Sequence, residues 1–479
     1  MLFNSITFAV FLPVVFALYW FATKGNVKFQ NMLLLVASYY FYACWDWRFQ
    51  LLLLFSTLLD YYAGIKIDEE SDKNKKTYWL YLSVVVNVGL LAVLKYYNFF
   101  VASFSDGLGL LGLDIELSSL QLIIPLGISF YTFHGLSYII DIYNDRIKPE
   151  RDVVNYALFV SFFPLLVAGP IERATHLLPQ LIKKREFSYS DATDGLRQIL
   201  WGLFKKIVIA DNCAKFANLI FENHTHYSGS TLVVGALFFT FQIYADFSGY
   251  SDIAIGTARL FGISIMKNFA FPYFSKNIAE FWRRWHISLS SWFRDYVYIP
   301  LGGSRMGRWK RIRNTGIVFL VCGLWHGANW TFVVWGLLNA LYMLPSILFG
   351  SNKSNNEKNN PTTSIKELLG IAITFGLTVI AWIVFRSTSV TEAIAYLSEM
   401  FSTTLFSIPD FPELKKAKHV AILTGIFMMV EWQGKKQEYA IEKLGSDWNK
   451  PLRWAMYYAI TLLILNEAGP EQQFIYFQF

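Results

Sequence analysis

The stretch NTGIVFLVCGLWHGANWTFVVWGLLNALYMLPSILF fills residues 314–349 and contains no aspartate, glutamate, lysine or arginine. About twenty apolar residues are enough to cross the hydrocarbon layer of a membrane as a helix, and this run is far longer. It holds one histidine, His326, between glycines and tryptophans. Because ionisable groups at membrane depth are costly and usually face a cavity, His326 is a candidate functional residue.

The rest of the chain has the same apolar character. Of its 479 residues, 54% are hydrophobic, 18% are aromatic and 16% are charged, and the mean hydropathy is +0.35. In soluble domains about a quarter of all residues are charged, so this composition excludes an ordinary soluble protein. Further apolar runs predict an all-α integral membrane protein with many spans; they lie near residues 2–22, 29–45, 49–65, 78–100, 120–142, 152–169, 231–262, 368–385 and 453–467.

Lysines and arginines cluster in alternate loops, and basic loops tend to stay in the cytoplasm. The loop from Val101 to Ser119 has no lysine or arginine, which predicts an extracytoplasmic N-terminus. If the basic cluster at 305–313 is cytoplasmic, a helix from Asn314 places His326 about 18 Å deep, near the middle of the bilayer. The net charge of +7 fits this loop bias, so it is poor support for nucleic-acid binding.

Charged residues interrupt the apolar pattern between Lys276 and Pro300, where His286 lies. A straight lipid-facing span cannot hold them, which predicts short re-entrant or interfacial helices. Guanidinium groups suit the phosphates of an acyl donor, although these arginines could equally pair with Glu280, Asp295 or lipid phosphates. The three candidates are Arg283, Arg284 and Arg294.

The motif YADFSGYSD places two carboxylates, Asp246 and Asp252, inside another apolar run. Carboxylates there need basic or hydroxyl partners. We therefore expect both residues to be structural partners of buried basic groups rather than catalytic bases. The three cysteines and the histidines lack the spacing of a ligand set, so no metal site is predicted.

Six motifs together resemble the membrane-bound O-acyltransferases, specifically the bacterial branch that O-acetylates extracytoplasmic polysaccharides such as alginate and peptidoglycan. The resemblance implies a ring of about 11 tilted spans with short re-entrant helices, a central funnel and a tunnel. It covers most of the chain, in MLFNSITFAVFLPVVFALYW, PLGISFYTFHGLSYIIDIY, FFPLLVAGPIER, FQIYADFSGYSDIAIGTARLFG, FWRRWHISLSSWFRDYVYIPLGGSR and GLWHGANWTFVVWG. We expect one membrane domain over 1–479, with a motif-bearing body (1–350), a polar connector (351–364) and C-terminal spans with an aromatic tail (365–479).

Matching motif positions implies that His326 is the catalytic histidine at the floor of the funnel and that His286 is the second, more variable one. Acetyl-CoA would bind from the cytoplasm, and only the acetyl group would cross. A neutral imidazole can take the proton of an attacking hydroxyl, while Asn329, Trp325 or backbone N–H groups could steady the oxyanion. Alternatives stay open for both residues: His326 could be a core histidine bonded to a helix carbonyl, and His286 could shape the donor channel or be an interfacial or network residue.

The last six residues, FIYFQF, form an aromatic tail with a single hydroxyl at Tyr476. The tail resembles the C-terminal motif of the small partner peptide used in D-alanylation of teichoic acids, where a tyrosine accepts the acyl group. A phenol leaves more readily than an alkyl alcohol, so a Tyr476 ester is a predicted relay from His326 to a second enzyme. The alternative is a tail that only packs against helices or headgroups.

The sequence has no GxSxG motif of its own, which predicts an extracytoplasmic partner transferase that completes transfer to the polysaccharide. The expected location is the bacterial inner membrane, and the lipid bilayer is the immediate partner. Two other function classes remain. One is a D-alanyl transferase fed by an acylated carrier protein, and the other is a non-enzymatic transporter.

Overall fold

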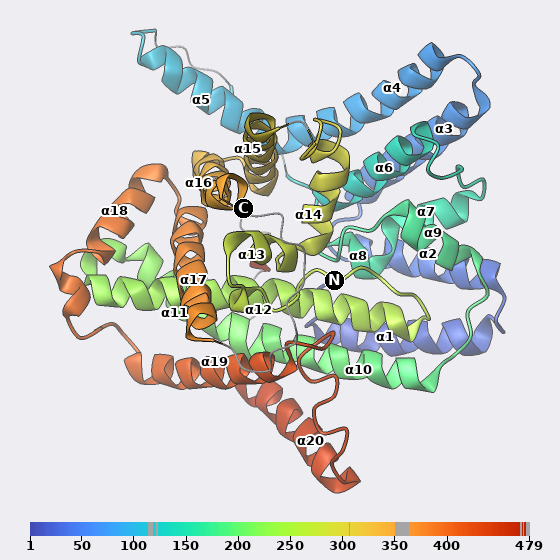
Figure 1. Cartoon of the computed structure of the whole chain (residues 1–479). Coiled ribbons are helices and arrows are strands. Elements are labelled where there is room, and N and C mark those ends of the chain that lie inside the picture. Colours follow the sequence, from blue (N-terminus) through green and yellow to red (C-terminus); the bar gives the residue numbers. More distant parts are fainter. Residues whose placement is uncertain are drawn as a thin grey trace. The chain divides into compact units, whose positions relative to one another are not determined.

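The computed structural model describes residues 1–113, 118–120, 123–305, 307–349, 364–469, 472, 474 and 475. Every regular element in these residues is a helix, and none of them forms a β-strand (Figure 1). The predicted all-α class is confirmed. Contacts divide the chain into two compact units, one of Met1–Ile199 with Ile253–Met266 and one of Leu200–Asp252 with Lys267–Phe479. The expected connector at 351–364 lies outside the described residues, apart from Ser364.

The first unit contains the N-terminal helices. Some of them begin at a polar side chain that accepts hydrogen bonds from the first backbone N–H groups of the helix, as Asp72 does from the N–H of Asn74 at 2.8 Å. The helices are α1 (Ile6–Ala17), α2 (Val27–Ala43), α3 (Phe49–Glu69), α4 (Lys73–Leu91), α5 (Tyr97–Gly109), α6 (Ile128–Tyr143), α7 (Val153–Ser161), α8 (Phe163–Leu166), α9 (Ala174–Ile182) and most of α10 (Tyr189–Leu203).

Helices α3, α4 and α6 pack around one buried carboxylate. Asp60 on α3 is 1% exposed and accepts hydrogen bonds from Ser83 at 2.6 Å and from Asn87 at 2.8 Å, both on α4. Gly135 on α6 makes room for it, because a Cβ there would lie 2.0 Å from the Asp60 carboxylate. The polar group is satisfied inside an apolar helix cluster, as buried carboxylates require.

The second unit contains the helices that carry the predicted site. They are α11 (Asp211–Glu222), most of α12 (Gly229–Leu260), α13 (Ile278–Arg284), α14 (Ile287–Phe293), α15 (Arg308–His326), α16 (Trp330–Leu348), α17 (Ile365–Arg386), α18 (Val390–Met400), α19 (Leu414–Gly434) and α20 (Lys450–Glu467). The two short helices α13 and α14 occupy the region 276–300, as the broken apolar pattern predicted.

Four helical segments of the described chain are long and apolar enough to cross a membrane. They are Lys73–Gly109, Gly229–Leu260, Trp330–Leu348 and Ile365–Arg386. The count of about 11 spans is therefore not reproduced. One reason is that predicted runs are broken: the run at 152–169 is split at Phe162 into α7 and α8, and the run at 120–142 becomes helical at Ile128.

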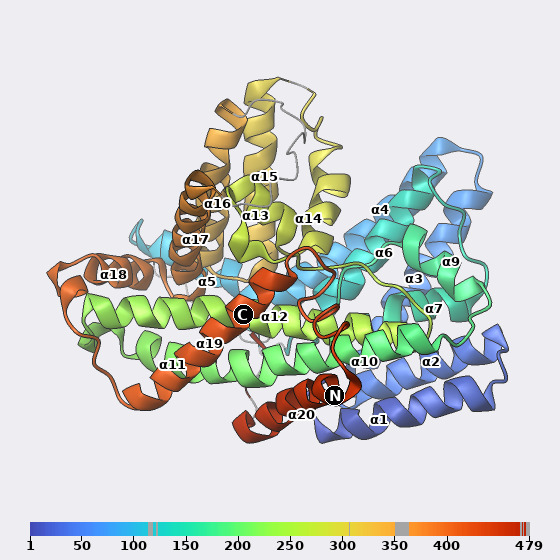
Figure 2. The same ribbon diagram turned by 60° about the horizontal axis from the view of Figure 1, so that its bottom comes forward.

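Helices α15 and α16 form a tight pair, side by side in both views (Figures 1 and 2). Glycines allow their backbones to touch. A Cβ at Gly323 would lie 2.2 Å from the carbonyl oxygen of Phe332, and one at Gly336 would lie 2.4 Å from that of Phe319. Small residues at helix contacts give this close approach in membrane proteins. The pair is the rigid frame of the site described next.

Candidate active site

His326 is the last residue of α15 and is 5% exposed. The chain continues through an extended Gly327, and Asn329 caps the next helix, α16. The long apolar run 314–349 therefore bends at the histidine, because a side-chain cap at Asn329 starts a new helix. The imidazole lies at a corner between two helices rather than within one straight span.

Three aromatic rings surround the imidazole of His326. The ring centroids of Trp325, Trp335 and Phe385 lie 4.9, 5.1 and 5.3 Å from the imidazole centroid, with interplanar angles of 75°, 85° and 77°. Edge-to-face contacts of this kind are favourable for aromatic rings. They fix the orientation of the imidazole in an apolar setting.

Trp335 is a functional candidate that the sequence did not single out. It is 1% exposed, and its ring stacks on Trp382 with a centroid separation of 5.9 Å. Its indole N–H is buried and has no acceptor in the part of the chain that the structure describes. A buried donor without an acceptor costs about 1–3 kcal/mol. A bound ligand would supply an acceptor for this N–H. The imidazole of His326 is one of the rings beside Trp335.

Asn329 uses both ends of its amide in the structure. Its Oδ1 accepts a hydrogen bond from the N–H of Thr331 at 2.9 Å, and its Nδ2 donates to the carbonyl oxygen of Thr388 at 2.8 Å. The side chain thus caps α16 and ties it to the loop that follows α17. The Nδ2 group has a second N–H, so oxyanion binding by Asn329 would use the hydrogen that does not point at Thr388.

His286 is held by an unusual backbone and by a buried amide. Its φ of 43° lies in the left-handed region, which is uncommon for residues other than glycine and concentrates at functional sites. Its Nδ1 lies 3.2 Å from Oδ1 of Asn268, which also accepts from the Ser288 hydroxyl at 2.6 Å. Since Asn268 Nδ2 donates to Ser251 at 3.2 Å, its Oδ1 is the acceptor. Nδ1 of His286 therefore carries the proton, and Nε2 is its basic nitrogen.

Trp325 lies between the two histidines. Its ring centroid is 4.9 Å from that of His326 and 6.0 Å from that of His286. His326 ends α15 and His286 directly precedes α14, so the folded chain brings His286 next to Trp325 and His326, which lie far from it in the sequence. The indole ring of Trp325 therefore contacts the imidazoles of both His286 and His326.

The three candidate arginines differ in their surroundings. Arg284 is paired with Glu280 at 2.5 Å, and Arg294 is paired with Asp295 at 2.8 Å. Arg283 is exposed and has no acidic partner among the described side chains. Of the three guanidinium groups, that of Arg283 is therefore the most available to a phosphate.

Two buried lysines accompany the carboxylates of the YADFSGYSD motif. Lys205 Nζ lies 2.5 Å from Asp252 Oδ2, and Lys206 Nζ lies 2.8 Å from both Asp246 and Asp211. A buried charge requires such a counter-charge, so these carboxylates have the geometry of structural partners. Sequence reasoning missed the lysines, although the adjacent pair in the apolar stretch WGLFKKIVIA was a visible signal. They lie in a π-helical segment, Phe204–Ala210, a type of irregularity that often marks functional regions.

Part of the C-terminal tail lies inside the second unit. The N–H of Ile475 donates to Asp246 Oδ2 at 2.8 Å, and Lys206 Nζ donates to the carbonyl oxygen of Gln472 at 3.3 Å. The same ion pair that joins Lys206 to Asp246 thus also binds the tail. Tyr476 follows directly and lies outside the described residues.

Aromatic contacts connect this tail to His286. Phe474 is 1% exposed, and its ring centroid lies 4.9 Å from that of Tyr250 and 5.8 Å from that of Phe247. Phe247 in turn meets the His286 imidazole edge-on at 4.7 Å. One phenylalanine therefore separates the tail from the second histidine.

These features place two buried imidazoles in one aromatic cluster, and the described residues contain no group of side chains that could hold a metal ion. The profile described as the membrane-bound O-acyltransferase family matches residues 146–385, which include His286 and His326. The chain belongs to this family and is an O-acyltransferase.

Relatives with stated activities extend the similarity to the whole chain. The probable alginate O-acetylase AlgI of Pseudomonas putida is 36% identical over 503 residues, covering 100% of each chain. The peptidoglycan O-acetyltransferase of Helicobacter pylori is 36% identical over 84% of this chain and 80% of its own. The teichoic acid D-alanyltransferase of Bacillus subtilis is 32% identical over 55% of this chain and 69% of its own.

Proposed function

We propose that this chain moves acetyl groups from cytoplasmic acetyl-CoA across the bacterial inner membrane for O-acetylation of an extracytoplasmic polysaccharide. The observation that carries the proposal is the end-to-end similarity to an alginate O-acetylase, with His326 buried at a helix corner. The peptidoglycan O-acetyltransferase supports the same class of acceptor. The D-alanyltransferase matches a smaller share of the chain, so D-alanyl transfer is the alternative.

In the proposed reaction His326 is the general base. A neutral imidazole takes the proton of the acceptor hydroxyl as its oxygen attacks the carbonyl carbon of the acetyl thioester. The carbon–sulfur bond then breaks, and the imidazolium returns the proton to the departing coenzyme A thiolate. Apolar surroundings disfavour the charged imidazole, and the three rings around His326 provide them. Such a base contributes on the order of a hundredfold to ten-thousandfold in rate.

The negative charge on the attacked carbonyl oxygen requires preorganised donors. The indole N–H of Trp335 is our first candidate, since it is buried beside His326 without an acceptor among the described residues. Trp325 and Asn329 remain candidates for positioning. Trp325 contacts both histidines, whereas Asn329 is engaged with Thr331 and Thr388.

Arg283 is proposed to bind a phosphate of coenzyme A, with Arg284 and Arg294 in weaker roles because each has a carboxylate partner. Charge-assisted hydrogen bonds from a guanidinium suit phosphate oxygens. His286 is proposed either as a second proton carrier or as a wall of the donor channel. Its buried position on the Asn268 network is compatible with both roles.

Tyr476 is proposed to accept the acetyl group from the site and to pass it, as a phenyl ester, to an extracytoplasmic partner transferase. The burial of Phe474 and Ile475 supports a tail that reaches the interior near His286. The family architecture of about 11 spans in a ring, with a funnel and a tunnel, would let donor and acceptor approach from opposite faces. An extracytoplasmic N-terminus belongs to the same proposal.

The test is release of coenzyme A by the purified full-length protein in proteoliposomes supplied with acetyl-CoA. We expect acetyl-dependent release that His326→Ala abolishes while the thermal unfolding profile is kept. An acylated D-alanyl carrier protein is the comparison donor, and its use in place of acetyl-CoA would establish the alternative. Unchanged turnover of His326→Ala would remove the assignment of the base.

A further inference from the structure

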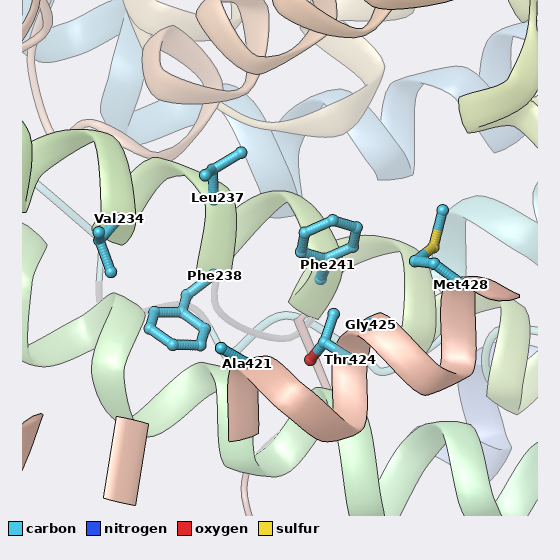
Figure 3. Close-up of a pocket in the computed structure, with 8 residues that line it drawn as sticks. All are labelled: Val234, Leu237, Phe238, Phe241, Ala421, Thr424, Gly425 and Met428. Carbon is cyan, nitrogen blue, oxygen red and sulfur yellow. The ribbon is translucent and has the colours of Figure 1, made fainter. Parts of the chain in front are cut away.

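An apolar groove runs along the second unit between α12 and α19 (Figure 3). Its volume is about 400 Å³, within the range of roughly 300–1,000 Å³ that is usual for ligand sites. The residues that matter below are Val234, Leu237 and Phe241 on α12, and Ala421, Gly425 and Met428 on α19. None of them belongs to the acyl-transfer site.

The two helices that border the groove run in the same direction. Thr231 Oγ1 lies 3.4 Å from the carbonyl oxygen of Asp410 near one end, and Tyr244 donates to Glu431 at 2.5 Å beyond the other. A helix rises about 1.5 Å per residue, so the groove extends about 10 Å from Ala421 to Met428. An extended hydrocarbon chain has this shape.

The groove offers no polar partner to a ligand. The only hydroxyl on its wall, that of Thr424, donates to the carbonyl oxygen of Val420 at 2.8 Å. Helix α12 has the length and hydropathy of a membrane span. Beside the groove on α19, Ile422 and Ile426 are 63% and 51% exposed, as expected of a surface that faces lipid.

A missing side chain gives the groove its depth. A Cβ built at Gly425 meets no atom within 4 Å. Glycine in the interior of a helix weakens it relative to alanine. Gly425 therefore leaves space in the groove, and a larger side chain at this position would fill that space without moving neighbouring atoms.

Two lysines on α19 precede the residues that line the groove. Lys418 precedes Ala421 by three residues and Gly425 by seven, which places all three on one face of α19, and Lys415 lies one turn earlier. Both lysines are exposed and have no acidic partner in the described part of the chain. Lys416, by contrast, pairs with Glu413 at 3.1 Å. An anionic lipid has a negative headgroup next to its apolar acyl chain. Lys415 and Lys418 next to the apolar groove match that arrangement.

We propose that this groove binds one acyl chain of an anionic phospholipid, whose headgroup is held by Lys415 and Lys418. The lipid would bridge α12, the helix of Asp246 and Asp252, to α19, the helix of Glu431. The proposal does not depend on acetyl transfer.

The experiment is native mass spectrometry of the purified full-length protein, equilibrated with equal amounts of phosphatidylglycerol and phosphatidylcholine that have identical chains. We expect one retained phosphatidylglycerol. Gly425→Phe should remove it, and Lys415→Gln and Lys418→Gln should each weaken the preference about fivefold. Matched controls are Gly376→Phe and Lys366→Gln on α17, since a Cβ at Gly376 also meets nothing within 4 Å and Lys366 is exposed. Both should retain the lipid as the unaltered protein does.

Several outcomes would overturn the proposal. Equal retention of the two lipids would indicate ordinary lipid contact without a site. Retained phosphatidylglycerol in Gly425→Phe would place the lipid elsewhere, as would equal loss in Gly376→Phe. A second copy of the chain, or a co-purified membrane helix, that is displaced by Gly425→Phe would identify a protein occupant instead. Circular dichroism of each variant separates loss of lipid from loss of fold.

Discussion

Asp246 accepts a hydrogen bond from the backbone N–H of Ile475 at 2.8 Å while the same carboxylate pairs with Lys206. A single buried ion pair thus holds the residue that precedes Tyr476. Charge-assisted hydrogen bonds of this kind are among the stronger polar contacts in proteins. Ile475 is thereby anchored within the unit that carries the proposed base.

Tyr476→Phe should abolish acetylation of the polysaccharide, because the relay loses its acyl-accepting oxygen. Mass spectrometry of the C-terminal peptide from the unaltered protein should show an acetyl group on Tyr476. Tyr458→Phe, which removes an exposed hydroxyl on α20, is the control and should leave acetylation unchanged. Full polymer acetylation by Tyr476→Phe would restrict the tail to a packing role.

Trp335→Phe should lower kcat for acetyl transfer on the order of a hundredfold, the usual loss when one oxyanion donor is removed. The KM for acetyl-CoA should change little, since the donor acts in the transition state. Trp382→Phe removes the same ring volume one ring farther from His326 and serves as the control. Equal loss of kcat in the two variants would point to packing rather than to the Trp335 N–H.

Arg283→Gln should raise the KM for acetyl-CoA about tenfold or more and leave kcat nearly unchanged, because a hydrogen bond to a charged group contributes about 1.5–3 kcal/mol. Arg294→Gln is the comparison variant and should raise the KM less, since Arg294 is already paired with Asp295. Initial rates at varied donor concentration measure both constants. An unchanged KM in Arg283→Gln would place the phosphates elsewhere.

The stability of the first unit should depend on pH through His176. Its Nδ1 lies 2.8 Å from a Glu172 oxygen, and this hydrogen bond raises the pKa of His176 above 6.5. The contribution is therefore complete below pH 6.5 and is lost as the pH rises through the folded-state pKa. It should not exceed about 1 kcal/mol, because the side chain is partly exposed.

Thermal unfolding at mildly acidic and mildly alkaline pH measures this effect. The unaltered protein should lose stability over that interval relative to His176→Gln. His226→Gln, at an exposed histidine of another unit, should follow the unaltered protein. A constant difference between the unaltered protein and His176→Gln at all pH values would exclude the titration.

The sequence predicted the membrane class and the location of the short helices, since both depend on local composition. Charged residues between Lys276 and Pro300 cannot face lipid, and α13 and α14 are accordingly short. The bend at His326 was harder to predict from the sequence. The residues GANW permit either a continued helix or a new one, and only the hydrogen bonds of Asn329 to Thr331 and Thr388 decide.

The spacing of residues along the sequence does not show which charged side chains pair with one another. The arginines near His286 had several possible partners, and among the residues that the structure describes carboxylates pair with Arg284 and Arg294 but not with Arg283. Likewise, Trp335 is one of many tryptophans in the sequence. Its buried N–H, which has no acceptor among the described residues, lies beside His326 because α15 packs against α16, and no local pattern encodes that packing.

The glycine contacts between α15 and α16 have a consequence for engineering of acyl-chain length. Because the backbones already touch at Gly323 and Gly336, α15 and α16 cannot move closer together to make room beside His326 for a longer donor. Phe385 comes from α17, outside that pair, and its ring centroid lies 5.3 Å from the imidazole. Substitutions intended to let the enzyme use propionyl or butyryl thioesters should therefore begin at Phe385.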